Sequence, residues 1–155
     1  MVSPHYKKNK GVKMTSQTNP TQTQISIQSQ EYSEKKALHC ARAAIDRKAE
    51  RTTVLNLSEI SSFTDYFVIC NGSSDRQVQA IADSIKKTLT DLGYELLSLE
   101  GYSEGRWVLM DFGDVVVHIF LDALRDYYDL DALWKDAERL KIPPGFYSPG
   151  LSRFN

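Results

Sequence analysis

The chain has few of the features that mark membrane, secreted or metal-binding proteins. No run approaches the roughly eighteen consecutive apolar residues that a membrane helix needs, and the N-terminus lacks the apolar core of a secretory signal. Only two cysteines occur, Cys40 in an expected helix and Cys70 at the end of an expected strand. We expect two free, buried thiols, and no cysteine or histidine spacing is typical of zinc. These absences favour a cytoplasmic globular protein without a metal or a membrane segment.

The charge is nearly balanced overall but is distributed unevenly. The formal net charge is −1, with 19 basic and 20 acidic residues. Residues 1–30 contain no acid and four lysines, Lys7, Lys8, Lys10 and Lys13. Residues 31–155 therefore hold 15 basic and 20 acidic residues, a net charge of −5. An acidic folded part argues against phosphate-dominated binding to nucleic acid. It favours a basic protein as the partner, because opposite charges accelerate encounter.

Composition divides the chain into three parts. Residues 1–31 include the polar stretch TSQTNPTQTQISIQSQ, which has too few hydrophobic residues for a core, so we expect a disordered extension. Its lysines would suit an organellar transit peptide, but it has no arginine and no amphipathic period, so organellar import is the weaker interpretation. Residues 32–140 are long enough for one folded domain. Residues 141–155 contain a Pro-Pro-Gly sequence and are expected to form an irregular tail.

Hydrophobic periodicity predicts an α/β domain. Apolar residues at helical spacing predict three helices, over residues 34–50, 75–92 and 123–140. Short apolar runs predict five strands, over residues 53–57, 66–70, 95–99, 106–112 and 115–120. The second strand is apolar on both faces, which is typical of a central position. The sequence therefore predicts a single domain in which a five-stranded mixed sheet is flanked by helices.

Several residues within these elements have structural interpretations. Gly72 lies in a turn that ends with Ser74 capping the second helix. Gly113 begins a tight hairpin between the last two strands. Aromatic residues recur at helical spacing in the last predicted helix, which is typical of core packing; they are Tyr127, Tyr128 and Trp134.

The last two predicted strands each combine one purely apolar face with one mixed face. The apolar faces, which belong against helices, consist of Val108, Met110, Phe112, Val115, Val117 and Ile119. The mixed faces consist of Trp107, Leu109, Asp111, Val116, His118 and Phe120, with Asp114 at the start of the second strand. A surface of this kind is typical of protein partners. Helices on both sides of the sheet would instead make the same residues core, and the pattern alone leaves both interpretations open.

No complete catalytic or metal-binding set of residues is visible. The turn at Gly72 lacks the Lys-Ser/Thr pair of a phosphate loop, and no Asp-x-Asp pair follows it, as a nucleotidyltransferase would need for magnesium. Asp111 begins a kinase-like Asp-Phe-Gly triplet, but the other kinase motifs are missing. We predict a protein that is not an enzyme and has no cofactor and no metal. A nucleotidyltransferase-like enzyme and a generic protein-interaction adaptor are the alternatives.

Three motifs occur in order between residues 33 and 134. They are SFTDYFVICNGSS at 62–74 followed by RQV at 76–78, RWVLMDFGDVVVHIF at 106–120 preceded by EG at 100–101, and RDYYDLDALW at 125–134. Together they resemble the Iojap-like ribosomal silencing factor family. A match of three motifs with family-like spacing is more specific than any single motif in the chain. The extensions at both ends depart from a minimal family member.

The resemblance implies a fold related to nucleotidyltransferases but without their catalysis. It also implies binding to the large ribosomal subunit at its ribosomal protein number fourteen, on the face that meets the small subunit, so that subunit joining is blocked and translation is repressed. With this partner, the mixed strand face becomes the expected docking surface, with contacts from Trp107, Leu109, Asp111, Asp114, Val116 and His118. Direct readout of nucleic acid and membrane binding are not expected. Family members can self-associate, so a homodimer is left open.

Overall fold

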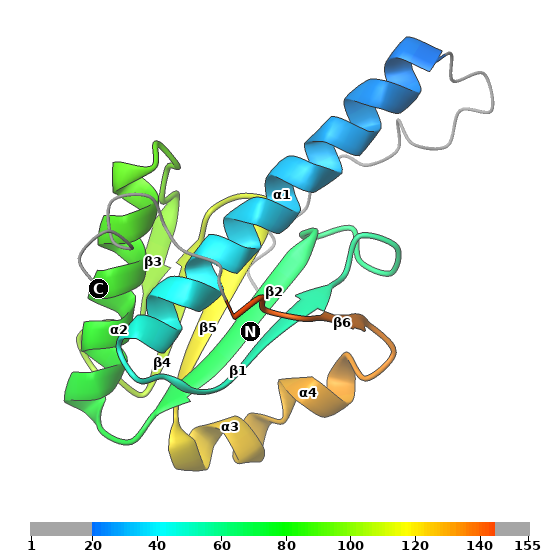
Figure 1. Ribbon diagram of the computed structural model, residues 1–155. Coiled ribbons are helices and arrows are strands. Elements are labelled where there is room, and N and C mark those ends of the chain that lie inside the picture. Colours follow the sequence, from blue (N-terminus) through cyan, green and yellow to red (C-terminus); the bar gives the residue numbers. More distant parts are fainter. Residues whose placement is uncertain (1–19, 145–155) are drawn as a thin grey trace.

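The computed structural model of the protein describes residues 20–144, in which six strands form one mixed sheet (Figure 1). The single α/β domain expected from the sequence is confirmed, with six strands rather than five. In chain order the elements are α1 (Pro20–Asp46), β1 (Glu50–Asn56), β2 (Tyr66–Gly72), α2 (Asp75–Asp91), β3 (Ser98–Glu100), β4 (Trp107–Asp111), β5 (Val115–Leu121), α3 (Asp122–Tyr128), α4 (Leu130–Leu133) and β6 (Glu138–Leu140).

The strands lie in the order β3-β4-β5-β2-β1-β6. β2 and β5 run parallel at the centre, in register from Tyr66 opposite Val115 to Gly72 opposite Leu121. The other neighbouring pairs are antiparallel. Every residue of β2 is buried, as expected of a central strand that is apolar on both faces. β3 and β6 form the two edges, and each has only three residues.

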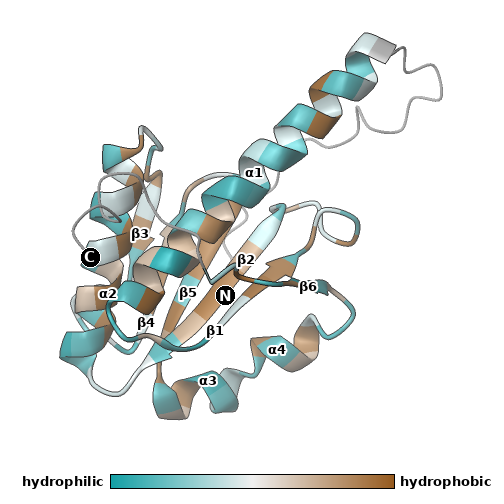
Figure 2. Ribbon diagram, in the orientation of Figure 1, coloured by the Kyte–Doolittle hydropathy of each residue, from teal (hydrophilic) through white to brown (hydrophobic). Residues whose placement is uncertain are grey.

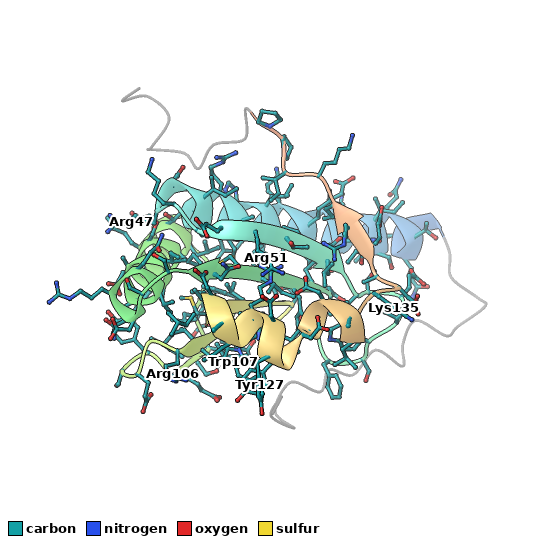
Figure 3. All side chains as sticks on the ribbon, turned by 90° about the horizontal axis from the view of Figure 1, so that it is seen from below. Arg47, Arg51, Arg106, Trp107, Tyr127 and Lys135 are labelled. Carbon is teal, nitrogen blue, oxygen red and sulfur yellow. The ribbon has the colours of Figure 1, made fainter. Side chains whose placement is uncertain are left out.

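Each face of the sheet has its own hydrophobic core. One face packs against α1 and α2, and it carries the purely apolar strand residues, as predicted; they include Val108, Met110, Val115, Val117 and Ile119. The other face carries a smaller cluster that includes Leu55, Phe67, Ile69, Leu109, Val116 and Phe120. Hydrophobic residues accordingly fill the central strands, while hydrophilic residues are frequent along both long helices (Figure 2). In the view from below, α1 lies on one side of the sheet and α3 on the other (Figure 3).

Helix α1 begins at Pro20 rather than at the predicted residue 34. The disorder expected of residues 1–31 is therefore wrong for residues 20–31, and the rest of that extension lies outside the described residues. Residues 21–32 are exposed, whereas the helix from Ser33 onward packs against the sheet and buries several small side chains. Once that half is anchored, each added residue gains a helical hydrogen bond at low entropic cost. The polar segment can thus continue the helix beyond the sheet without a core of its own (Figure 1).

The last predicted helix, over residues 123–140, is interrupted after Tyr128 and is wrong beyond Leu133. The chain turns at Asp129, whose backbone is left-handed with φ 49° and ψ 53°. Its carboxylate accepts a hydrogen bond from the Ala132 amide at 3.3 Å and so begins the short helix α4. Aspartate tolerates this conformation better than most residues and is a good N-cap. The chain then forms β6 against β1. Residues 141–144 have no regular structure, and the rest of the expected tail lies outside the described residues.

The shorter predicted features are close to the structure. The Ser74 hydroxyl accepts a hydrogen bond from the Gln77 amide at 3.1 Å and caps α2, and Gly113 has φ 96° between β4 and β5. The third strand covers only Ser98–Glu100 instead of residues 95–99. Cys40 and Cys70 are free and buried, as expected. Burial raises the pKa of both thiols, that of Cys70 to about 12, so both remain protonated and unreactive at neutral pH.

Candidate partner-binding surface

The mixed faces of β4 and β5 lie on the side of the sheet away from α1 and α2, but they are not open to solvent. His118 is 0% exposed, Val116 1% and Leu109 6%. Side chains from the α3 and α4 region cover them, namely Leu124, Leu130 and Trp134. The three strand residues expected to contact a partner therefore form a second core beneath the surface, because the polypeptide itself supplies the covering layer.

Trp107 is the strand residue of this face that reaches the surface, and it is half-buried. Its ring lies 4.9 Å from the ring of Phe120 and 4.6 Å from that of Tyr128 in tilted arrangements. Its indole N–H donates a hydrogen bond to Nδ1 of His118 at 3.2 Å. Packing and the hydrogen bond together hold the indole in one orientation, which suits an interface anchor.

His118 supports Trp107 from below in its neutral form. Burial lowers the pKa of His118 to about 3, so the imidazole carries no charge at neutral pH. Since Nδ1 accepts from Trp107, the ring proton belongs on Nε2. The Phe67 ring packs edge-on against the imidazole at 4.5 Å. Nε2 has no hydrogen-bond partner among the described residues. His118 is thus a structural acceptor and not an exposed contact residue.

The two acidic residues expected on this face have other roles in the structure. Asp111 is 7% exposed, and its carboxylate accepts a hydrogen bond from the Gly113 amide at 2.7 Å. Asp114 lies in the hairpin, where its carboxylate pairs with Lys36 and Ser33 of α1. Burial raises the pKa of Asp114, but the hydrogen bonds from Lys36 and Ser33 outweigh it, so the pKa is lowered overall. Asp114 therefore ties the hairpin to α1, on the opposite side of the sheet from Trp107.

The helices α3 and α4 expose large hydrophobic groups, and those of α3 adjoin Trp107. Tyr127 is 78% exposed, Leu133 69% and Tyr128 47%. Tyr128 packs against Trp107, and Tyr127 packs edge-on against Tyr128 at 5.0 Å. Trp107 and Tyr127 lie at the same end of the molecule in Figure 3. The sequence pattern assigned both tyrosines to the core, and the structure corrects this. Trp107, Tyr127, Tyr128 and Leu133 are called the aromatic surface below.

The aromatic surface is set in an acidic segment. Residues 122–138 contain six acidic and two basic residues, a net charge of −4. One of the two basic residues, Arg125, is buried, and Asp126 pairs with Arg51 of β1 at 3.0 Å, while the carboxylates of Asp129 and Asp136 are exposed. Exposed aromatic groups in an acidic segment fit a basic protein surface that offers apolar contacts.

The turn at the start of α2 is compact and is used structurally. A Cβ added to Gly72 would lie 3.2 Å from the Val78 amide nitrogen, so the turn packs closely on the helix. The Gln77 side chain accepts hydrogen bonds from the amide and the hydroxyl of Ser73. Across residues 20–144, no group of three or more His, Cys, Asp or Glu residues lies close enough to hold a metal ion. Within the same range no helix is both long and apolar enough to cross a membrane.

The fold and this surface define an α/β protein whose candidate site is a protein-contact surface. Residues 30–150 match the family described as "Ribosomal silencing factor during starvation", and the chain belongs to this family, as its motifs predict. It is 50% identical to the ribosomal silencing factor RsfS of Bacillus subtilis over 97 residues, which is 63% of this chain and 82% of the relative. It is 33% identical to the chloroplastic protein Iojap of Zea mays over 69% of this chain and 46% of that protein.

Solved structures agree with this assignment. A crystal structure of a Chromobacterium violaceum protein superposes with a TM-score of 0.65 at 34% sequence identity, covering 76% of this chain and 95% of that one. A Bacillus halodurans structure superposes with a TM-score of 0.59 at 46% identity, covering 66% and 92%. The described fold is therefore shared over nearly the whole length of both proteins.

Proposed function

We propose that this protein binds the large ribosomal subunit, at its ribosomal protein number fourteen, and prevents the small subunit from joining. Family membership supports the ribosome as the target. The observation that carries the proposal on this chain is the aromatic surface, because the exposed Tyr128 packs on the half-buried Trp107 and the exposed Tyr127 packs on Tyr128, while Leu133 of the following helix is also exposed. Clusters of this kind are the usual anchors of protein interfaces.

The proposed contact residues differ in part from those expected from the sequence. Trp107 remains an anchor, and Tyr127, Tyr128 and Leu133 join it. Four of the expected residues, Leu109, Asp111, Val116 and His118, act beneath the surface by supporting β4, β5 and the indole of Trp107. Asp114 is left out, because its carboxylate pairs with α1.

The mechanism is occupation of a surface and requires no chemical step. A docked domain excludes the small subunit because both would fill the same space. The net charge of −4 over residues 122–138 speeds encounter with a basic ribosomal protein. No group of the protein has to bind nucleic acid, a cofactor or a metal for this. The protein would act in the compartment where its ribosomes are, which for the bacterial relatives is the cytoplasm. The same exposed surface would also serve a homodimer, which docking would have to separate.

A sucrose-gradient experiment with a matched pair of variants tests the proposal. Purified protein is mixed with separated subunits, and both co-migration with the large subunit and the yield of whole ribosomes are measured. Leu133→Ser removes an apolar group from the aromatic surface. Leu97→Ser makes the same change at a leucine that is 57% exposed just before the edge strand β3. Both variants are expected to fold as the wild type does, because exposed side chains contribute little to stability.

We expect the wild type and Leu97→Ser to co-migrate with the large subunit and to suppress whole ribosomes, and Leu133→Ser to do neither. Equal binding by both variants would remove the aromatic surface from the proposal. A wild type that stays at the top of the gradient at low salt would remove the ribosome and leave a protein adaptor with another partner. Crosslinking to ribosomal protein number fourteen, lost with Leu133→Ser, would identify the contact on the subunit.

A further inference from the structure

The segment that carries the aromatic surface is not held by a buried apolar face. In α3 the only buried residue is Arg125, and α4 has no buried residue. Leu124, Leu130 and Trp134 are only partly buried against the sheet. By contrast, six residues of α2 are buried, four of them large aliphatic side chains. Apolar packing therefore holds Tyr127, Tyr128 and Leu133 in place less firmly than it holds α2, and polar contacts must supply part of the fixation.

Arg125 supplies that fixation through its guanidinium, which is 2% exposed. Its Nε and Nη2 donate to the two carboxylate oxygens of Asp131 at 3.2 and 3.0 Å, a bidentate pair that joins α3 to α4. Its Nη1 donates to the side-chain oxygen of Asn71 at 3.0 Å and to the backbone carbonyl of Arg51. Its Nη2 also donates to the Thr53 hydroxyl at 3.3 Å. One side chain thus connects α3 with β1, β2 and α4.

The surroundings of Arg125 are adapted to this role. The Asn71 amide donates to Asp122 at the start of α3, so Asn71 binds two residues of that helix, Asp122 and Arg125. Arg51 has a left-handed backbone with φ 52°, at the position where the β1–β2 register shifts. This conformation costs free energy in a residue with a side chain, and it turns the Arg51 carbonyl toward Arg125. Asp129, between α3 and α4, is left-handed as well. Arg125 binds the carbonyl of the first of these two residues, Arg51, and the second, Asp129, lies just before Asp131, which Arg125 also binds.

We propose that Arg125 is the positioning residue of the docking surface: its buried hydrogen bonds to Asp131, Asn71, Thr53 and the Arg51 carbonyl hold α3 and α4 in the geometry that a partner recognises. The inference rests on the proposed function, because it assigns a role in presenting the same surface. Arg125 does not itself touch the partner, since it is buried.

Lysine cannot take over this role, although it keeps the charge. A guanidinium presents five N–H donors in a planar fork, whereas an ammonium presents three from one point and cannot form the bidentate pair. Arg125 makes five hydrogen bonds and an ammonium can make at most three, so Arg125→Lys loses at least two of them and cannot keep the bidentate pair with Asp131. Because few apolar contacts hold α3 and α4, we expect these helices to lose their fixed position while the α1–α2 side of the sheet stays folded.

Fluorine NMR measures the position of the segment without a ribosome. The chain has only two tryptophans, Trp107 and Trp134, so 5-fluorotryptophan labelling gives two resonances, which Trp107→Phe assigns. We expect Arg125→Lys and Asp131→Asn to shift or broaden the Trp134 resonance. Lys36→Met is the matched control, because it breaks the other buried ion pair, between Lys36 and Asp114, on the opposite side of the sheet. It should leave the Trp134 resonance unchanged.

Binding to isolated large subunits is then measured with the same variants. We expect Arg125→Lys to raise the apparent Kd at least about tenfold, equivalent to about 1.4 kcal/mol, and Lys36→Met to bind as the wild type does. Asp131→Asn provides the same test if Arg125→Lys does not fold. Wild-type affinity in a folded Arg125→Lys or Asp131→Asn variant, or an unchanged Trp134 resonance, overturns the inference. An equal loss in Lys36→Met also overturns it, because general destabilisation would then explain the effect. Failure of the wild type to bind refutes the proposed function, and the NMR result still decides whether Arg125 positions the segment.

Discussion

The two helical layers that cover the sheet are built on different physical principles. α1 and α2 are long, and their inner faces bury aliphatic and small side chains against β2, β4 and β5. α3 and α4 have seven and four residues, and the one fully buried side chain between them is a charged arginine. The first layer is stabilised by removal of apolar area from water. The second layer combines three half-buried hydrophobic side chains with the directed hydrogen bonds of Arg125, and it leaves large hydrophobic groups exposed.

The α1–α2 layer contributes mainly to the stability of the fold, and the α3–α4 layer contributes mainly to partner recognition. The part of the first layer that packs on the sheet buries its hydrophobic residues, whereas a layer that is fixed in part by polar bonds can expose Tyr127, Tyr128 and Leu133 and still keep its geometry. The cost is that the second layer depends on a few bonds whose geometry matters. Substitutions in the first layer should therefore mainly lower the free energy of unfolding, and substitutions in the second layer should mainly weaken binding to the partner.

The largest effect on stability is expected for Ile85→Ala in α2. Ile85 is fully buried in the core beneath α1 and α2, so its truncation should lower the free energy of unfolding by about 2–5 kcal/mol. The matched change Leu130→Ala, at a half-buried leucine of α4, should cost about 1 kcal/mol. Urea unfolding with an unchanged m-value measures both. Equal losses at the two sites would mean that the second layer is also held by apolar burial.

A smaller effect is expected from pH through His118, which lies in the core between β5 and the second layer. The folded-state pKa of His118 is about 3 because of burial, against an ordinary value of 6.5. The unfolded chain therefore binds a proton below pH 6.5 that the folded chain does not. The full contribution of this group is present above pH 6.5 and is lost progressively as the pH falls toward 3. Between pH 7 and pH 5 the loss should be about 2 kcal/mol, at 1.36 kcal/mol for each pH unit below 6.5.

Urea unfolding at pH 7 and pH 5 measures this loss, and His118→Gln is the control. Glutamine keeps an acceptor for the Trp107 indole but does not titrate, so the loss between the two pH values should shrink by about 2 kcal/mol in the variant. His39, whose pKa is lowered by burial and by Lys35, stays in both proteins and cancels in the comparison. The carboxylates of Asp114 and Asp131, whose pKa values are lowered, titrate below this range. An identical pH dependence in both proteins would show that His118 is not the buried titrating group.

The smallest effect on stability is expected for Leu133→Ser, the change that should abolish docking. Its side chain is 69% exposed, so the free energy of unfolding should change by less than about 0.5 kcal/mol. Thermal unfolding of the wild type and the variant measures the difference. A drop comparable with that of Ile85→Ala would place Leu133 in the core of the second layer and break the contrast between the layers.

The parts of the fold that follow from local pattern could be predicted from the sequence. Alternation along β4 and β5 separates the apolar face from the mixed face, and the inner stripe of α2 is visible at helical spacing. The break at Asp129 could not be predicted, because residues 123–140 contain neither glycine nor proline. There the chain follows contacts with residues distant in sequence, such as Arg125 with Thr53 and Asn71. Such contacts override a helical period without leaving a local signal.

The candidate site could be predicted only in part for a related reason. The pattern predicts Trp107 as a contact residue, because it is a large aromatic residue on a strand face that also carries polar residues. The helical period places Tyr127 and Tyr128 in the core only if the helix continues, and its interruption at Asp129 removes that basis. Asp114 was placed by strand parity, but it lies in the hairpin before β5 begins, where alternation no longer applies. The sequence does not indicate that Arg125 binds Asp131, Asn71 and Thr53, because only the folded chain brings these residues together.

The arrangement around Arg125 also has a consequence for the order in which the protein is made. Arg51, Thr53 and Asn71 are synthesised before Asp131 and before β6, which closes the edge of the sheet beside β1. A domain folds as a unit, so the hydrogen bonds of Arg125 cannot all form until Asp131 has left the ribosome. On the proposed function, a nascent chain cannot present a fixed recognition surface to the ribosome that is translating it before that point.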